Sequence, residues 1–196
     1  FDKPRVDLEA FRSRVQTIIG KLTKGVRTLA GSRKVEVIQA RATFKDATTF
    51  QLSGPNAPDE LSFAHAILAT GSQSAIPKSL KLDDPRVMDS TSALQLAEIP
   101  ARLLVVGGGY IGLELGTVYQ ALGSETTVVE ALPRLLNSVD ADLVRPLNQR
   151  MQRRFKAIKL NTTVEKLDAR ENGLVATFTD SQGTSTETFD RVLVAV

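Results

Sequence analysis

Hydrophobic positions in residues 103–130 form two short runs with a longer stretch between them. Leu103–Val106 is short and apolar, as expected of a strand buried on both faces of a parallel sheet, and Thr126–Val129 is predicted to be a second buried strand. Between the two runs the sequence predicts a glycine-rich turn followed by a helix. This order of strand, turn, helix and strand predicts a βαβ unit in an α/β fold.

The part of the chain before this unit shows a helical pattern and then strand patterns. Residues 7–30 carry apolar side chains at helical spacing after Asp7, which suits an N-cap, and the stripe that they form is interpreted as core-facing. The stripe comprises Leu8, Phe11, Val15, Ile18, Ile19, Leu22, Val26 and Leu29. Short strands are predicted over residues 35–40, 42–45, 49–52, 60–63 and 66–69, the last of them buried.

A polar stretch with Pro77 and Pro85 separates these strands from the βαβ unit and is interpreted as a linker. Beyond the unit, three strand patterns separated by turn residues predict an antiparallel meander. The predicted elements of this part are helices over residues 90–97 and 140–154, a parallel strand over 155–160, meander strands over 164–168, 174–179 and 187–189, and a buried strand over 193–196.

Composition and charge restrict the classes of partner. The 196 residues are 42% hydrophobic and 24% charged, as in an ordinary globular protein of one or two domains. A formal net charge of +3 comes without a basic stripe interleaved with aromatic residues, so no nucleic acid is expected as a partner. No apolar run is long enough for a membrane span, and no signal peptide is found. The absence of cysteine excludes a disulfide framework and a cysteine metal site, and it favours a cytoplasmic location.

The glycines of the turn have the spacing of a dinucleotide-binding fingerprint. Gly107 permits a tight turn, and Gly109 lets the backbone approach a pyrophosphate closely. Gly112 allows the helix to pack tightly on its strand, with Gly116 one turn further along the same face. The helix N-terminus then offers unpaired N–H groups and a positive dipole end to phosphates.

An acidic residue closes the second strand of the unit. Glu130 lies 21 residues after Gly109. A carboxylate at this position can accept hydrogen bonds from both hydroxyls of an adenosine ribose, and it would repel a 2′-phosphate. NAD is therefore favoured over NADP. The turn by itself leaves open whether the nucleotide is NAD or a flavin, because both cofactors use it.

Four segments together resemble one known family. Residues 107–123 read GGGYIGLELGTVYQALG, which closely resembles the NAD-binding signature of the dithiol-oxidising pyridine nucleotide–disulfide oxidoreductases. Ala69–Ser72 looks like the second flavin contact of that family, Asp84–Thr91 like its linker, and Asp190–Val196 like the strand before its next glycine. The resemblance implies a partial FAD-binding domain over residues 1–76, a linker and short helix over 77–99, and an NAD-binding domain over 100–196.

The resemblance also implies that the chain is an internal piece of a flavoenzyme. The family places a first flavin-binding glycine motif and a redox cysteine pair upstream, and a dimerisation domain with a catalytic His–Glu pair downstream. No catalytic residue is therefore expected within the chain, and His65 is interpreted as a surface or strand-edge residue. The implied parent is a homodimer that uses FAD to oxidise dihydrolipoamide, or the lipoyl domain of a 2-oxo-acid dehydrogenase complex, with NAD.

Cofactor contacts follow from the matching positions. Tyr110 is interpreted either as a gate over the flavin or as ordinary packing at a helix start. Glu114 is interpreted as a buried carboxylate whose partner is a lysine near the cysteines, or else as a solvent-facing acid. The implied NAD contacts are Gly107, Gly108, Gly109, Tyr110, Ile111, Gly112, Leu113, Glu114, Glu130 and Val164, the last against the adenine. The implied FAD contacts are Ala42, where the family has glycine, and Thr70, Gly71 and Ser72.

Two alternatives to dihydrolipoamide oxidation stay open. The parent could be another enzyme of the family, such as a mercuric reductase or a soluble transhydrogenase, because the redox cysteines and the substrate pocket lie outside this sequence. NADP-dependent relatives of the glutathione reductase type are disfavoured by Gly112 and Glu130. The second alternative is a module that binds NAD without catalysis.

Overall fold

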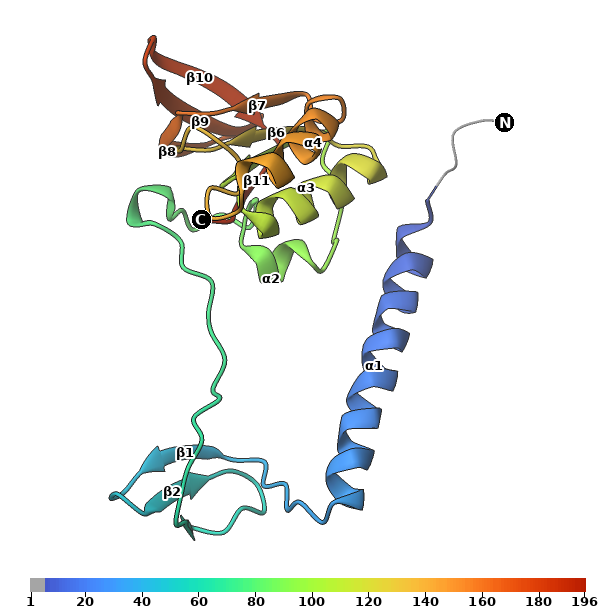
Figure 1. Cartoon of the computed structure of the whole chain (residues 1–196), viewed down its shortest axis with the longest axis vertical. Coiled ribbons are helices and arrows are strands. Elements are labelled where there is room, and N and C mark those ends of the chain that lie inside the picture. Colours follow the sequence, from blue (N-terminus) through green and yellow to red (C-terminus); the bar gives the residue numbers. More distant parts are fainter. Residues whose placement is uncertain (1–5) are drawn as a thin grey trace. The chain divides into compact units, whose positions relative to one another are not determined.

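The computed structural model describes residues 6–196, which divide into two compact units (Figure 1). One unit spans Glu9–Ser72, and the other spans Gln73–Val196 together with residues 6–8. The first five residues of the predicted partial FAD-binding domain lie outside the described residues. Over residues 6–196, no helix combines the length and the apolar character needed to cross a membrane.

The first unit contains one long helix and a small antiparallel sheet. The helix α1 (Leu8–Ser32) confirms the predicted helix and begins directly after Asp7. The strands β1 (Arg41–Phe44), β2 (Thr49–Ser53) and β3 (Glu60–Ser62) pair in sequence order and confirm three of the predicted strands. Phenylalanine rings hold the sheet together on one side, with centroids 4.6 Å apart in two of the pairs among Phe44, Phe50 and Phe63.

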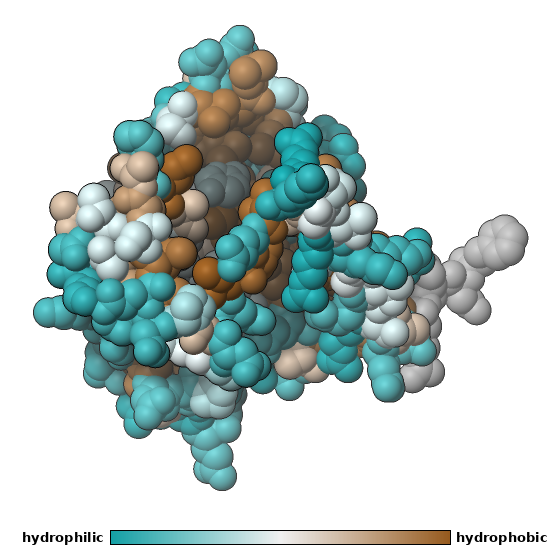
Figure 2. All heavy atoms as spheres, turned by 90° about the horizontal axis from the view of Figure 1, so that it is seen from below, coloured by the Kyte–Doolittle hydropathy of each residue, from teal (hydrophilic) through white to brown (hydrophobic). Residues whose placement is uncertain are grey.

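Three predictions for this unit are wrong. The α1 stripe does not face a core, because the helix has no buried residue and Leu22 is 68% exposed. Residues 35–40 and 66–69 form no strand, and Ile67 is 93% exposed. An apolar run becomes a buried strand only when neighbours pair its backbone N–H and C=O groups, and within residues 6–196 no strand pairs with either run. Apolar side chains accordingly reach the surface among polar ones in Figure 2.

The second unit is built on a parallel sheet, as predicted, and one of the five strands of this sheet, β4, lies in the segment predicted as a linker. Its strand order is β4–β11–β5–β6–β7, and every neighbouring pair is parallel. The helix between β5 and β6 is α3, so the predicted βαβ unit is confirmed. The bounds of these elements are β4 Val87–Met88, β5 Arg102–Val106, α3 Tyr110–Leu122, β6 Glu125–Val129, α4 Ala141–Gln152, β7 Ala157–Lys159 and β11 Arg191–Val194.

Successive residues of β5 enter two different cores. Leu103 and Val105 pack against the helices α3 and α4, while Leu104 and Val106 pack against an antiparallel sheet on the opposite face. That sheet has the order β10–β9–β8 and confirms the predicted meander. Its strands are β8 (Thr163–Arg170), β9 (Gly173–Asp180) and β10 (Gly183–Phe189). Because both faces are covered, the run of apolar residues in β5 is fully buried.

The segment before β5 packs within this second unit. It contains a 3₁₀ turn, η1 (Lys78–Leu80), the strand β4 and the short helix α2 (Ser90–Ala93). The hydroxyl of Tyr119, a buried residue of α3, donates to the carbonyl of Ala93 over 2.9 Å, and burial raises the pKa of this phenol. The helix predicted over residues 90–97 ends early, because Leu96 has a left-handed φ of 48° that a right-handed helix does not accommodate.

An ion pair joins the beginning of β5 to the residue before β11. Asp190 accepts hydrogen bonds from the backbone N–H of Arg102 (2.7 Å) and from its guanidinium Nη2 (2.6 Å). The guanidinium holds the pKa of the Asp190 carboxyl below its ordinary value, against a burial effect that raises it. The pair therefore stabilises the fold only while Asp190 is ionised.

We expect Asp190→Asn to lower the free energy of unfolding by about 1 kcal/mol near pH 7. Because the pKa is lower in the folded state, the carboxylate contributes fully above its unfolded value of about 4, and its contribution is lost as the pH falls through the folded value. Urea unfolding at neutral pH measures the loss of stability in the variant, and urea unfolding at acidic pH measures how far that loss disappears. Asp168→Asn, which removes a pair with the exposed Lys166, is the control and should cost about 0.5 kcal/mol or less. An Asp190→Asn deficit that stays the same at acidic pH would contradict this account.

Candidate functional site

The glycine turn lies at the carboxyl end of β5, next to the carboxyl end of β6. Gly107 has a φ of +112° and donates its N–H to the carbonyl of Val129 over 2.8 Å. Gly109 is the N-cap of α3, so the helix points its N-terminal N–H groups toward this edge of the sheet. Ligands of open α/β sheets bind at this edge, and a helix N-terminus there attracts phosphate.

The four glycines differ in how much room surrounds them. A Cβ at Gly107 would lie 2.4 Å from the carbonyl oxygen of Ala195, and one at Gly112 would lie 2.2 Å from that of Gly107. At Gly116 the nearest atom would be 3.4 Å away, which is ordinary contact. At Gly109 a Cβ would have no other described residue, its chain neighbours aside, within 4 Å. The chain therefore requires glycine at 107 and 112 for its own packing, whereas the space at Gly109 is open to a ligand.

Glu130 directly follows β6, and its carboxylate spans two loops. Its Oε2 accepts the N–H of Gly108 over 2.7 Å, and its Oε1 accepts the N–H of Leu132 over 2.8 Å. The side chain is partly buried, so both oxygens are held in place at the edge of the turn. A carboxylate has about four lone-pair positions, which leaves acceptor capacity for ribose hydroxyls.

A second contact to the turn comes from the loop over residues 131–139, which the sequence analysis did not identify. The N–H of Leu136 donates to the carbonyl of Gly108 over 3.0 Å, and Leu135 is 1% exposed. A Cβ at Gly108 would lie 2.6 Å from Leu135 Cδ2. Leu136 has a φ of 47°, and no feature of a leucine in sequence indicates this conformation.

A pocket of about 240 Å³ lies beside the turn and brings together three of the predicted NAD contacts. Gly107 and Glu130 line it from the positions directly after β5 and β6, and Val164 lines it from β8 of the meander. A pocket lined by both an apolar side chain and a carboxylate suits an adenosine, which has a flat base and a polar ribose. Together with the open space at Gly109, these residues fit a dinucleotide.

The other predicted NAD contacts lie along α3. Tyr110 is 67% exposed at the first turn of the helix, so it has room to move, and Ile111 is partly buried. Leu113 is buried in the core between the sheet and the helices, so its side chain supports the helix. Glu114 is exposed, and the lysine that the resemblance implies as its partner is not part of this sequence. The helix turns this position away from the core that buries Leu113 and Leu115.

The predicted FAD contacts are in the first unit. Ala42 is an exposed residue of β1, paired with Leu52 in β2. Thr70, Gly71 and Ser72 are exposed on a segment without helix or strand, and Gly71 has a φ of +76°. A turn of this kind presents backbone groups to a ligand, but these four residues do not enclose one.

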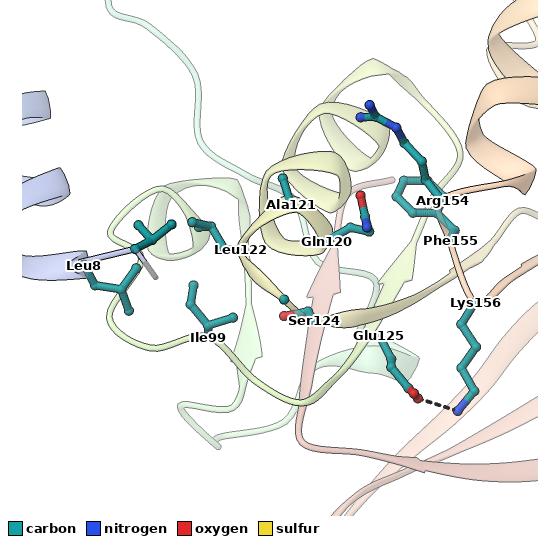
Figure 3. A pocket seen from close by; sticks show the side chains of 12 residues that line it. Leu8, Ile99, Gln120, Ala121, Leu122, Ser124, Glu125, Arg154, Phe155 and Lys156 are labelled. Atoms are coloured by element: carbon teal, nitrogen blue, oxygen red, sulfur yellow. Dashed lines mark hydrogen bonds and ion pairs between the residues drawn. The ribbon is translucent and has the colours of Figure 1, made fainter. Parts of the chain in front are cut away.

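A larger hollow, of about 910 Å³, lies at the opposite edge of the parallel sheet (Figure 3). Its lining includes Ile99, Leu122 and Phe155, and its charged groups include the ion pair between Glu125 and Lys156. Glu125 is the first residue of β6, so the hollow is at the amino end of that strand. Nucleotides bind at the carboxyl end of parallel strands, and size alone does not make this hollow the site.

A family model and individual relatives both match the sequence over nearly its whole length. The sequence model of the pyridine nucleotide-disulphide oxidoreductase family matches residues 3–196. Dihydrolipoyl dehydrogenase from Haemophilus influenzae is 38% identical over 197 residues, and the enzyme of the same name from Vibrio cholerae is 36% identical. Each alignment covers 100% of this chain and 41% of the relative, so the chain spans less than half of the length of these proteins.

Solved structures show the same architecture. The flavoprotein disulfide reductase RclA from Escherichia coli superposes with a TM-score of 0.84 at 26% identity, covering 98% of this chain and 43% of that one. LpdA from Mycobacterium tuberculosis gives a TM-score of 0.86 at 24% identity and supports the fold. The predicted α/β fold and the resemblance of the sequence motifs are both confirmed, and the chain belongs to the pyridine nucleotide-disulphide oxidoreductase family.

Proposed function

We propose that this chain is the NAD-binding part, with a portion of the FAD site, of a dihydrolipoamide dehydrogenase. The observation that carries the proposal is the position of Glu130, whose carboxylate is bound to the glycine turn and borders the pocket beside Gly107. A carboxylate at this place selects a ribose with both hydroxyls free, which is the difference between NAD and NADP. The names of the relatives at 36–38% identity support the dithiol substrate.

The residues of this chain would bind and orient the nicotinamide cofactor. The N–H groups at the start of α3 would face the pyrophosphate, and the open space at Gly109 would admit it. Glu130 would accept the ribose hydroxyls, while Val164 would contact the adenine. Tyr110, exposed at the first residue of α3, would lie toward the nicotinamide. When bound, FAD would supply the redox step between the dithiol and NAD.

The division of labour between the units follows from these assignments. Residues 9–72 would contribute to the flavin site through Ala42 and Thr70–Ser72, and residues 100–196 would hold NAD. The whole protein would act as a homodimer in the cytoplasm on dihydrolipoamide or on a lipoyl domain of a 2-oxo-acid dehydrogenase complex. The relatives that support this role of the whole protein are longer than the chain, which spans 41% of the Haemophilus influenzae enzyme.

Kinetics of the full-length protein test the proposal. We expect NAD-dependent oxidation of dihydrolipoamide, followed by the absorbance of NADH, with a kcat/KM for NAD at least about tenfold above that for NADP, because one lost or repelled polar contact is worth about 1.4 kcal/mol or more. Mercuric ion reduction and hydride exchange between NADH and NADP are the parallel assays. Turnover in one of these without dihydrolipoamide oxidation would replace the proposed substrate, and NADH binding without any turnover would identify a binding module.

A further inference from the structure

The pocket beside Gly107 and Glu130 has a wall that the glycine fingerprint does not provide. Pro77, Ser79 and Leu80 line it, and all three belong to the segment predicted as a linker. Pro77 precedes the 3₁₀ turn η1, and its carbonyl accepts the N–H of Leu80 over 2.9 Å. The segment that leads into the second unit therefore forms part of the same pocket as the predicted NAD contacts.

Core packing fixes the position of this turn. Leu80 is 4% exposed and belongs to the hydrophobic cluster that also contains Val106, Val129 and Val164. Two of these residues end the central strands β5 and β6, and the third is the predicted adenine contact on β8. Because Leu80 is held in this cluster, the fold also fixes the positions of the exposed residues Pro77 and Ser79 in the lining of the pocket.

The hydroxyl groups around the pocket differ in their hydrogen bonding. Thr162 donates to the carbonyl of Leu160 over 2.9 Å, and Thr163 donates to the carboxylate of Glu165 over 2.9 Å. The hydroxyl of the exposed residue Ser79 makes no hydrogen bond to the described part of the chain. Of the three pocket hydroxyls, that of Ser79 is thus the one whose proton is free to be donated to a ligand, whereas Thr162 and Thr163 keep only their acceptor lone pairs.

We propose that the turn over residues 77–80 is a wall of the adenine-binding site, with Ser79 donating to or accepting from the polar edge of the base. The inference rests on the proposed binding of NAD. Glu130 marks the position of the adenosine ribose, and the base attached to that ribose must lie in the adjoining space. That space has Val164 and Pro77 as apolar surfaces and Ser79 as its free hydroxyl, which is the combination that a purine requires.

The experiment separates the adenine end of the cofactor from the nicotinamide end. Binding of NADH, ADP-ribose and nicotinamide mononucleotide to the full-length protein is measured by calorimetry for Ser79→Phe and for the parent. We expect Ser79→Phe to weaken NADH and ADP-ribose by about tenfold or more, because a bulky side chain would occupy the space of the base. Nicotinamide mononucleotide, which lacks adenine, should bind as before.

Two further variants keep the result interpretable. Ser181→Phe places the same bulk on the exposed turn between β9 and β10 and should change none of the three affinities. Ser79→Ala removes the hydroxyl without adding bulk and should weaken ADP-ribose by about fivefold. Unchanged ADP-ribose binding in both Ser79 variants would overturn the adenine wall, as would an equal loss for the mononucleotide. A parent protein that binds neither NADH nor ADP-ribose would instead overturn the proposed function.

Discussion

Replacing Gly112 with alanine is expected to lower the free energy of unfolding by about 3 kcal/mol or more, as for an overpacked core position that cannot relax. The added Cβ would lie 2.2 Å from the carbonyl oxygen of Gly107 and 3.0 Å from Val105 Cγ1. The first of these atoms belongs to the backbone of the glycine turn, so it can move only if the turn itself moves. Helix α3 would have to separate from β5, and nucleotide binding would fall together with stability.

Gly116→Ala is the matched control on the same helix. Its Cβ would be 3.4 Å from Val105 Cγ2 and 3.5 Å from Phe155 Cζ, both ordinary contacts. Alanine also favours a helix interior over glycine by about 1 kcal/mol, so this variant should be neutral or slightly stabilised. Denaturant unfolding of both variants measures the difference. Equal stability of the two would show that the close approach at Gly112 does not constrain the fold.

The βαβ unit that contains these glycines could be predicted from the sequence alone. Each of its elements is specified locally: β5 by an apolar run, the turn by glycines at fixed offsets, and the end of β6 by Glu130. These local signals agree with the global fold, since both faces of β5 are covered by neighbours within the same unit. The pattern alone was enough to place Gly107, Glu130 and the strands that carry them.

The burial of an apolar segment could not be predicted in the same way where no described residue covers that segment. Residues 66–69 and the stripe on α1 are apolar, and an apolar pattern indicates what can be buried but not what covers it. The helix period of α1 depends on its own sequence, so the helix was predicted correctly. Its exposure depends on neighbours that no local pattern specifies.

The contacts that complete the site were missed for a different reason. Leu136 binds the carbonyl of Gly108 through its backbone N–H, and Leu80 reaches the pocket from a segment of prolines and polar residues. A hydrogen bond from a backbone N–H does not depend on the residue type, so the sequence does not indicate it. The prolines and polar residues of the 77–80 segment are typical of a linker, so they do not indicate that its turn packs in the core. Only the tertiary arrangement shows that the loop 131–139 and the turn 77–80 both border the glycine turn and its pocket.

Glu130→Ala should raise the KM for NAD in the full-length protein by about tenfold or more, since hydrogen bonds to a charged group contribute about 1.5–3 kcal/mol each. The variant removes the acceptor of the Gly108 and Leu132 N–H groups as well as the proposed ribose contact. Reduction of the enzyme by dihydrolipoamide, followed without NAD, should change little. Glu125→Ala, on an exposed ion pair at the opposite end of β6, is the control and should leave the KM unchanged.

Glu130→Gln should not restore binding, although it has the size of glutamate. Both carboxylate oxygens accept backbone N–H groups, and an amide has one acceptor oxygen, so its NH₂ would face either Gly108 or Leu132 as donor against donor. The ratio of NADH to NADPH affinity then separates two roles of this residue. If Glu130 only holds the turn, its removal weakens both cofactors equally. If it also contacts the ribose, the alanine variant loses NADH more than NADPH, because a 2′-phosphate no longer meets a negative charge.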